Sequence, residues 1–196
     1  MESSKLSFKF YLDESSAKVN LADVVPIFHS WIQLHLIPDH LLIDVADYAH
    51  VPDGPGVVLV AHEANFYLDR FDGRQGFTYV RKQPIDGSFA DRLRLVFRSA
   101  LEACQLLETN PSLPGIKFRA NEADFRINDR FFAPNTAATF ASVKPELEKF
   151  VRGIYGSSVT LEHRGNEKQL FDVALRAAGK FDAATLLSKL ESPQLT

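Results

Sequence analysis

The chain has 196 residues and a formal net charge of −3, from 22 basic and 25 acidic side chains. This length suits one large domain or two small ones, and 45% hydrophobic with 24% charged residues is typical of a globular protein. Acidic and basic residues are interspersed and form no basic stripe, so the composition gives no electrostatic support to nucleic-acid binding.

The chain has one cysteine, Cys104, which excludes a disulfide within the chain and a cysteine-based metal cluster. An apolar helical pattern surrounds it and favours an inert buried thiol over a nucleophile. The first ten residues lack the charged start and long apolar run of a signal peptide, and no apolar stretch approaches the ~18 residues of a membrane span. We therefore expect a soluble, cytoplasmic protein with no membrane partner.

Hydrophobic spacing predicts the first elements of the chain. Alternating apolar residues indicate a strand over 5–12, and helical spacing indicates a helix over 21–34 that Asn20 could cap. A second helix is predicted over 89–108, where Ser88 and Asp91 have nearly the pattern of a capping box. Arg94 and Arg98 lie off the apolar stripe of this helix, which is typical of a solvated face.

The second half of the chain repeats this mixture of strands and helices. After the breakers at 110–115, the sequence predicts a short strand and a hairpin turning at Asn128 and Asp129. A helix over 137–155, two strands near 159–161 and 170–175, and a helix over 181–190 follow. No Pro/Gly/Ser-rich linker interrupts the chain, so we predict one α+β domain over 1–196, with a mostly antiparallel sheet and amphipathic helices packed on one face. A helix followed by a hairpin occurs at 20–82 and at 136–177, which is a weak pseudo-repeat.

Residues 40–82 read as a central three-stranded meander with two turns. A two-residue turn at Asp72 and Gly73 sets Phe66 opposite Tyr79, and a tight loop over 52–55 sets Val45 opposite His62. Alternation then divides the side chains between two faces. The predicted core face holds Leu41, Ile43, Val45, Val58, Val60, Phe66 and Tyr79, and the predicted solvated face holds His40, Tyr48 and Tyr67.

Three polar residues, Asp47, His62 and Arg81, fall on the core face of this predicted meander, as diagonal neighbours roughly 7–8 Å apart. Buried charges are costly unless they are paired, so one interpretation is a structural ion pair at the rim of the core. The other is a ligand pocket or an acid–base site, in which a carboxylate fixes the histidine tautomer and the arginine attracts an anion. Tyr79, on the same face, completes this candidate ligand-binding set.

Other chemical signatures are missing from the sequence. The histidines show neither HxxxH nor HExxH spacing, and the chain has no GxSxG elbow and no phosphate loop, so we predict neither a metal nor a cofactor. Two functional hypotheses remain. The first is a non-enzymatic binding module for a small anionic ligand or a protein partner, and the second is a small enzyme that uses the Asp-His-Arg cluster. The face with Tyr48 and Tyr67 would serve a homodimer if no helix covers it.

Overall fold

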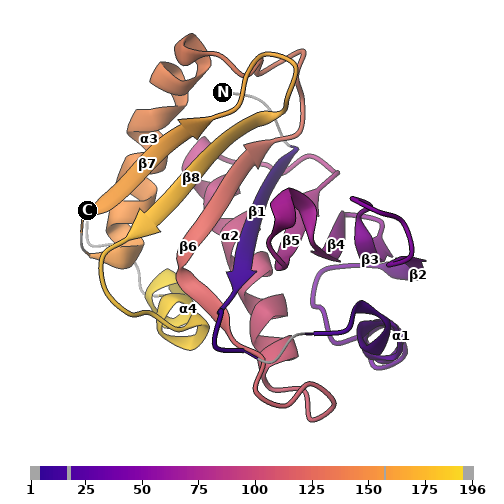
Figure 1. Cartoon of the computed structure of the whole chain (residues 1–196). Coiled ribbons are helices and arrows are strands. Elements are labelled where there is room, and N and C mark those ends of the chain that lie inside the picture. Colours follow the sequence, from indigo (N-terminus) through magenta and orange to yellow (C-terminus); the bar gives the residue numbers. More distant parts are fainter. Residues whose placement is uncertain (1–4, 17–18, 157, 192–196) are drawn as a thin grey trace.

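The computed structural model describes residues 5–16, 19–156 and 158–191. Within these ranges, eight antiparallel strands form one sheet in the order β2-β3-β4-β5-β1-β6-β8-β7, and four α-helices pack on it (Figure 1). This arrangement confirms the predicted single α+β domain. No helix in these ranges combines the length and the apolar character that a membrane crossing requires.

The elements follow one another in mixed order along the chain. The strands are β1 (Leu6–Leu12), β2 (Leu42–Tyr48), β3 (Gly56–Ala61), β4 (Ala64–Asp69), β5 (Gly76–Arg81), β6 (Phe118–Ile127), β7 (Val159–Arg164) and β8 (Phe171–Ala177). The helices are α1 (Val24–Gln33), α2 (Phe89–Glu108), α3 (Ala137–Tyr155) and α4 (Ala183–Glu191), and the 3₁₀ turns are η1 (Leu21–Asp23) and η2 (Phe71–Gly73). The order strand, helix, antiparallel strands, helix occurs twice, from β1 to α2 and from β6 to α4. A sequence repeat between 20–82 and 136–177 stays a prediction.

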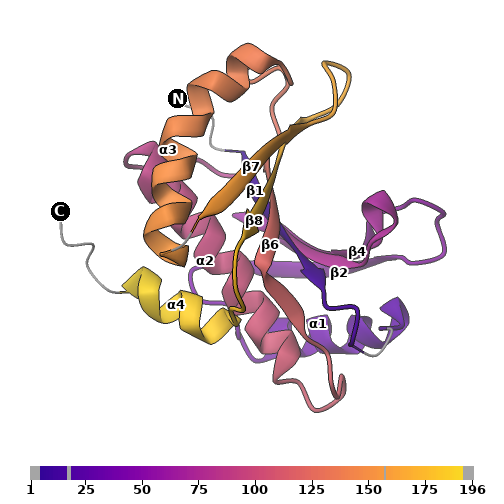
Figure 2. The same cartoon turned by 60° about the vertical axis from the view of Figure 1, so that its left-hand side comes forward.

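The helices cover the sheet according to their apolar stripes. Helix α2 lies against the central strands β1 and β5, α1 against β2 and β3, and α3 against β7, while α4 packs on α2 (Figure 2). The capping box predicted for α2 is present, since the Ser88 hydroxyl accepts from the Asp91 backbone N–H and the Asp91 carboxylate accepts from Ser88. Because α2 crosses the centre of the sheet, side chains beside its apolar stripe can contact the loops and helices next to it.

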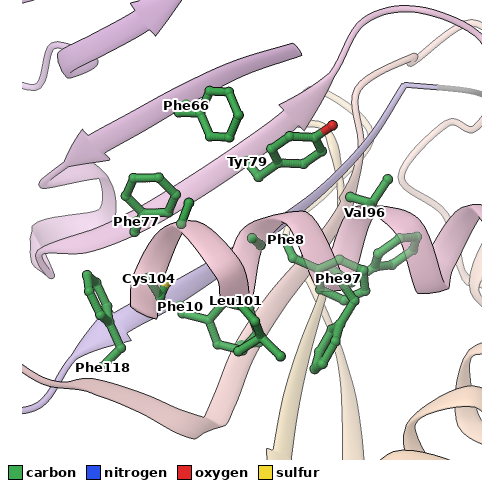
Figure 3. Close-up of a cluster of buried hydrophobic side chains, with 14 of the residues drawn as sticks. Phe8, Phe10, Phe66, Phe77, Tyr79, Val96, Phe97, Leu101, Cys104 and Phe118 are labelled. Carbon is green, nitrogen blue, oxygen red and sulfur yellow. The ribbon is translucent and has the colours of Figure 1, made fainter. Parts of the chain in front are cut away.

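An aromatic cluster between α2 and the sheet forms the centre of the core (Figure 3). The ring centroid of Phe97 on α2 lies 5.0 Å from that of Phe8 and 5.3 Å from that of Phe10, both on β1. Cys104 lies in the same cluster, fully buried, and its burial raises the pKa of the thiol. The predicted buried position of this cysteine is confirmed.

Residues 40–82 form an antiparallel meander as predicted, but with four strands rather than three. The expected middle strand is in fact two strands, β3 and β4, joined by a turn at His62 and Glu63. Neither of these residues has a positive φ angle, so the turn needs no glycine or asparagine and leaves no turn signal in the sequence. The β4–β5 register is the predicted one, with Phe66 opposite Tyr79.

The unexpected turn changes which side chains of β3 face the core. In the β2–β3 pair Val45 lies opposite Leu59 and not opposite His62, so the predicted register is wrong. The shift from His62 to Leu59 is three residues, and an odd shift exchanges the two faces of a strand because side chains alternate with a period of two. The core face of β3 consists of Val57, Leu59 and Ala61 instead of Val58 and Val60.

Strand β2 contains an irregularity that the sequence analysis also missed. Its register shifts between Leu42 and Asp44, which places a β-bulge at Ile43. The bulge lets both Leu42 and Val45 pack against the core. Leu41 and Ile43, which we predicted to be buried, are 65% and 56% exposed.

The predicted hairpin at 128–129 is also wrong. Strand β6 runs without a break from Phe118 to Ile127, and the residues after it form a loop in which the Phe131 side chain is fully exposed. Strand β6 is long because it pairs on both sides, with β1 and β8.

The face of the sheet opposite the helices carries charged side chains, several of them buried. Because Phe8 and Phe10 of β1 point toward α2, alternation directs Lys9 and Tyr11 to the other face. Lys9 is only 1% exposed. Its buried ammonium group donates to the Phe71 carbonyl of η2 at 3.0 Å and to the Asp69 carboxylate of β4. Strand β1, predicted to be half-buried, is therefore buried on both faces.

Candidate ligand-binding site

The structure separates Asp47 and His62, which the sequence analysis placed side by side. His62 lies in a turn, and its backbone N–H donates to the Leu41 carbonyl just before β2. Asp47 lies six residues after Leu41, which corresponds to about 20 Å along a strand at ~3.3 Å per residue. Both side chains are exposed, and the Asp47 carboxylate accepts from the Ala49 backbone N–H at 2.8 Å. The predicted convergence of Asp47, His62 and Arg81 is wrong because it depended on the incorrect register. A ligand-binding role for Asp47 and His62 stays a prediction.

Arg81 and Tyr79 do lie together, but beside a different histidine, His40. The Tyr79 hydroxyl oxygen is 2.9 Å from Nε2 of His40, and Figure 3 shows this hydroxyl at the edge of the aromatic cluster. Burial raises the pKa of Tyr79, and the nearby Arg81 guanidinium opposes that rise. Burial also lowers the pKa of His40, and the Arg81 charge adds to this effect.

His40 reaches this position through the loop that precedes β2. Asp39 adopts a left-handed φ of 57°. The His40 ring that follows packs on Phe66 and Tyr79, with centroid distances of 5.4 and 5.6 Å. The sequence analysis placed His40 on the solvated face of the meander. It is partly buried instead, because strand β2 begins only at Leu42 and alternation does not apply before it.

Both ring nitrogens of His40 are engaged. Nδ1 lies 2.8 Å from the Pro38 carbonyl oxygen, which can only accept, so Nδ1 carries the hydrogen. In the neutral imidazole that the lowered pKa favours, Nε2 then accepts from the Tyr79 hydroxyl. The histidine is thereby held in one tautomer and one orientation, with no free nitrogen for proton transfer.

A cleft of about 500 Å³ opens beside this histidine–tyrosine pair, and we call it the α2 cleft. One wall is a face of α2, whose lining positions recur at the three- and four-residue spacing of a helix. The other wall is the 38–40 segment with the end of β5. The volume falls within the roughly 300–1,000 Å³ that is usual for small-molecule sites. The lining residues are Pro38, Asp39, His40, Arg81, Asp91, Arg94, Leu95, Arg98, Ser99 and Glu102.

The three arginines of the α2 cleft differ in how they are paired. Arg94 donates to the Leu190 carbonyl at 2.7 Å, and Arg81 donates through Nε to the Gln83 carbonyl at 3.1 Å. Arg98 is partly buried yet has no hydrogen bond and no ion pair within the described part of the chain. The cleft therefore contains a guanidinium whose five N–H groups are all free to bind a ligand.

The carboxylates of Asp39, Asp91 and Glu102 also line the α2 cleft. Asp91 is occupied by the cap of α2, where it accepts from the Ser88 backbone and hydroxyl. Burial raises the pKa of Glu102, and the Arg98 charge opposes that rise. Arg98 and Arg81 form one wall of the cleft, where their guanidinium N–H groups can bind an anion.

Sequence reasoning missed most of this site. Arg94 and Arg98 were predicted to lie on a solvated face, since helical spacing shows only which residues avoid the apolar stripe. Their partner segment, 38–40, is far away in the sequence and packs there through tertiary contacts. The one local signal was the pair Pro38-Asp39, a turn that could have exempted His40 from the alternation of β2.

A second cleft, of about 390 Å³, lies on the opposite face of the sheet between Phe71 and Leu170. Its two arginines are already paired with acids of the sheet. Arg164 lies 2.5 Å from Asp124 and 2.8 Å from Asp172, and Arg126 contacts the same two carboxylates. Because both of its guanidinium groups are bound to carboxylates, this cleft suits an anion less well than the α2 cleft does.

Among the described residues, no three histidine, cysteine or carboxylate side chains are grouped so that they could hold a metal ion. No protein-family model matches the chain, and no curated protein sequence matches it. We therefore infer the function from the geometry of the clefts.

Proposed function

We propose that the protein is a binding module for a small anionic ligand held in the α2 cleft. The observation that carries this proposal is Arg98, a partly buried guanidinium without a hydrogen bond or ion pair in the described part of the chain. Arg81 supplies a second positive charge, and His40, held by its hydrogen bond to the buried Tyr79, also lines the cleft. Bidentate guanidinium contacts favour carboxylate or phosphate groups.

The enzyme alternative has less support at this site. A general acid or base needs a nitrogen within reach of the substrate, and both nitrogens of His40 are occupied by Pro38 and Tyr79. Tyr79 itself is fully buried. Proton transfer would require this pair to separate first, whereas ligand binding needs no rearrangement.

The test uses Arg98→Gln, which removes the charge and breaks no hydrogen bond or ion pair with any described residue. Arg152→Gln is the matched control, because Arg152 is exposed on α3 and, among the described residues, pairs only with Glu148. Calorimetric titration with a panel of small di- and tricarboxylates and phosphate esters measures the affinity. Loss of a charged hydrogen bond corresponds to about a tenfold or greater loss of affinity. We expect that loss in Arg98→Gln and unchanged binding in Arg152→Gln. Equal affinity in both variants, or no binding by any panel member, would refute the proposal.

A protein partner is the second candidate function, and one surface favours it. Large exposed hydrophobic side chains lie on the edge strand β2 and in the segments just before and after it, and exposed hydrophobic patches mark interaction surfaces. They are Leu34, Leu36, Leu41, Ile43, Tyr48 and Val51. A homodimer through the face with Tyr48 and Tyr67 stays a prediction. We propose instead to test a dimer through the β2 edge, by sedimentation velocity of the wild type and of Ile43→Lys. A concentration-dependent dimer in the wild type that is lost in the variant supports it, and a monomer throughout removes it.

A further inference from the structure

Three arginines from separate segments surround one carboxylate on the sheet face opposite the helices. Arg74 follows η2, Arg119 belongs to β6 and Arg176 to β8. Arg74 binds Glu122 with both terminal nitrogens, at 2.7 and 3.1 Å. Nη1 of Arg119 lies 3.3 Å from Glu122, and Nε of Arg176 lies 3.8 Å from it. We call this group the open-face arginine cluster.

The charges in this cluster do not balance. Glu122 supplies one negative charge against three positive charges, and its pKa is lowered by the hydrogen bond from Arg74. The other carboxylate within 4.0 Å, in the described part of the chain, is Glu14, which lies 3.8 Å from Arg119 and is 88% exposed. An exposed pair at that distance contributes little, because water and salt screen it. The cluster therefore has an excess of positive charge.

Two of the three guanidinium groups also have unused donors. Arg74 is held firmly, since it binds Glu122 and its guanidinium carbon lies 3.8 Å from the centre of the Tyr11 ring. The side chains of Arg119 and Arg176 are 33% and 61% exposed. Neither side chain makes a hydrogen bond to any described residue. Each guanidinium offers five N–H groups in a planar fork. Both forks border the same cleft, which has a volume of about 430 Å³.

We propose that the open-face arginine cluster binds a phosphate group. A phosphate monoester carries about −1.5 to −2 charges at pH 7 and three strong acceptor oxygens, which matches the excess charge and the free forks of Arg119 and Arg176. Glu122 orients the cluster by fixing Arg74 over Tyr11. This site lies on the other face of the sheet from the α2 cleft, so it is independent of the function proposed there.

The experiment titrates inorganic phosphate and glycerol 3-phosphate into the full chain at constant ionic strength, with chloride as the compensating anion. Arginine Nε–H signals in NMR spectra locate the site, and calorimetry gives the affinity. The test variants are Arg176→Gln and Arg119→Gln, whose side chains have no hydrogen bond to lose. Arg152→Gln, with a 62% exposed side chain, matches Arg176 in exposure and charge.

We expect each test variant to weaken the affinity about tenfold or more, and Arg152→Gln to leave it unchanged. Binding of the ester without inorganic phosphate assigns the site to a phosphorylated metabolite, and equal binding of both assigns it to the free ion. Either result supports the inference. Unchanged affinity in Arg176→Gln and Arg119→Gln overturns it, as does the absence of binding. A loss confined to Arg98→Gln overturns it too, while leaving the proposed function of the α2 cleft intact.

Discussion

The ammonium group of Lys9 lies 2.5 Å from a carboxylate oxygen of Asp69, and only 1% of the lysine side chain is exposed. The same carboxylate accepts from the Phe71 backbone N–H and the Thr78 hydroxyl, at 2.9 Å each. This ion pair joins β1 to the end of β4 and fixes η2 over the open face of the sheet. It also holds in place the segment just before Arg74, whose side chain donates to Glu122.

Breaking this pair from one side should be strongly destabilising. Lys9→Met leaves Asp69 buried without its counter-ion, which costs about 3–5 kcal/mol of unfolding free energy in comparable cases. Lys168→Met, at an exposed lysine, should change stability by less than about 0.5 kcal/mol. Urea unfolding followed by circular dichroism measures both. Similar midpoints for the two variants would contradict the structural role of Lys9.

Backbone contact at the start of β3 gives a second prediction. Gly56 has a φ of +69°, and a Cβ there would lie 2.1 Å from the Leu68 carbonyl oxygen, whereas a Cβ on Gly115, at φ +80°, would meet nothing within 4 Å. Both alanine variants incur the strain of a left-handed backbone, about 1–2 kcal/mol. Gly56→Ala adds a steric overlap of about 1–3 kcal/mol. The melting temperature of Gly56→Ala should therefore be well below that of Gly115→Ala. Equal melting temperatures would argue against the close approach of β3 and β4.

Stability should depend on pH through His40. Burial lowers its pKa below the ordinary value of 6.5, so the folded protein keeps this ring neutral at pH values where the unfolded chain takes up a proton. Because the unfolded state then binds more protons, unfolding free energy falls as the pH drops from about 7 toward the lowered pKa. We expect His40→Gln to lose less stability than the wild type between pH 7 and 5. His50→Gln, at an exposed histidine, is the control, and parallel curves for wild type and His40→Gln would contradict the prediction.

The separation of Asp47 and His62 can be tested by substitution. Both side chains are exposed and not linked, so His62→Gln and Asp47→Asn should each change the unfolding free energy by less than about 0.5 kcal/mol. The effects of the two substitutions should also add in the double variant, because distant sites do not couple. A cost of several kcal/mol, or a coupling energy above about 0.5 kcal/mol, would restore the buried network that the sequence analysis considered.

Local patterns in the sequence determined most of the elements and much of the core. The alternation of Leu6, Phe8 and Phe10 and the apolar stripe of α2 fix which side chains meet, since a strand repeats every two residues and a helix every 3.6. The capping box at Ser88 and the pairing of Phe66 with Tyr79 were predictable for the same reason. These features depend on residues that are close in the chain or joined by a single turn.

Only the tertiary structure decided where the candidate sites lie. A turn at His62 that uses ordinary backbone angles leaves no signal, and it displaced the whole predicted Asp-His-Arg group. The approach of His40 to Tyr79, 39 residues away, and of Arg74 to Glu122, 48 residues away, depends on how helices and strands pack. The sequence by itself determined which residues are polar and which faces are apolar. Whether a charged side chain ends in water, in a cleft or under η2 was decided by long-range packing, because burial depends on neighbours that local periodicity does not specify.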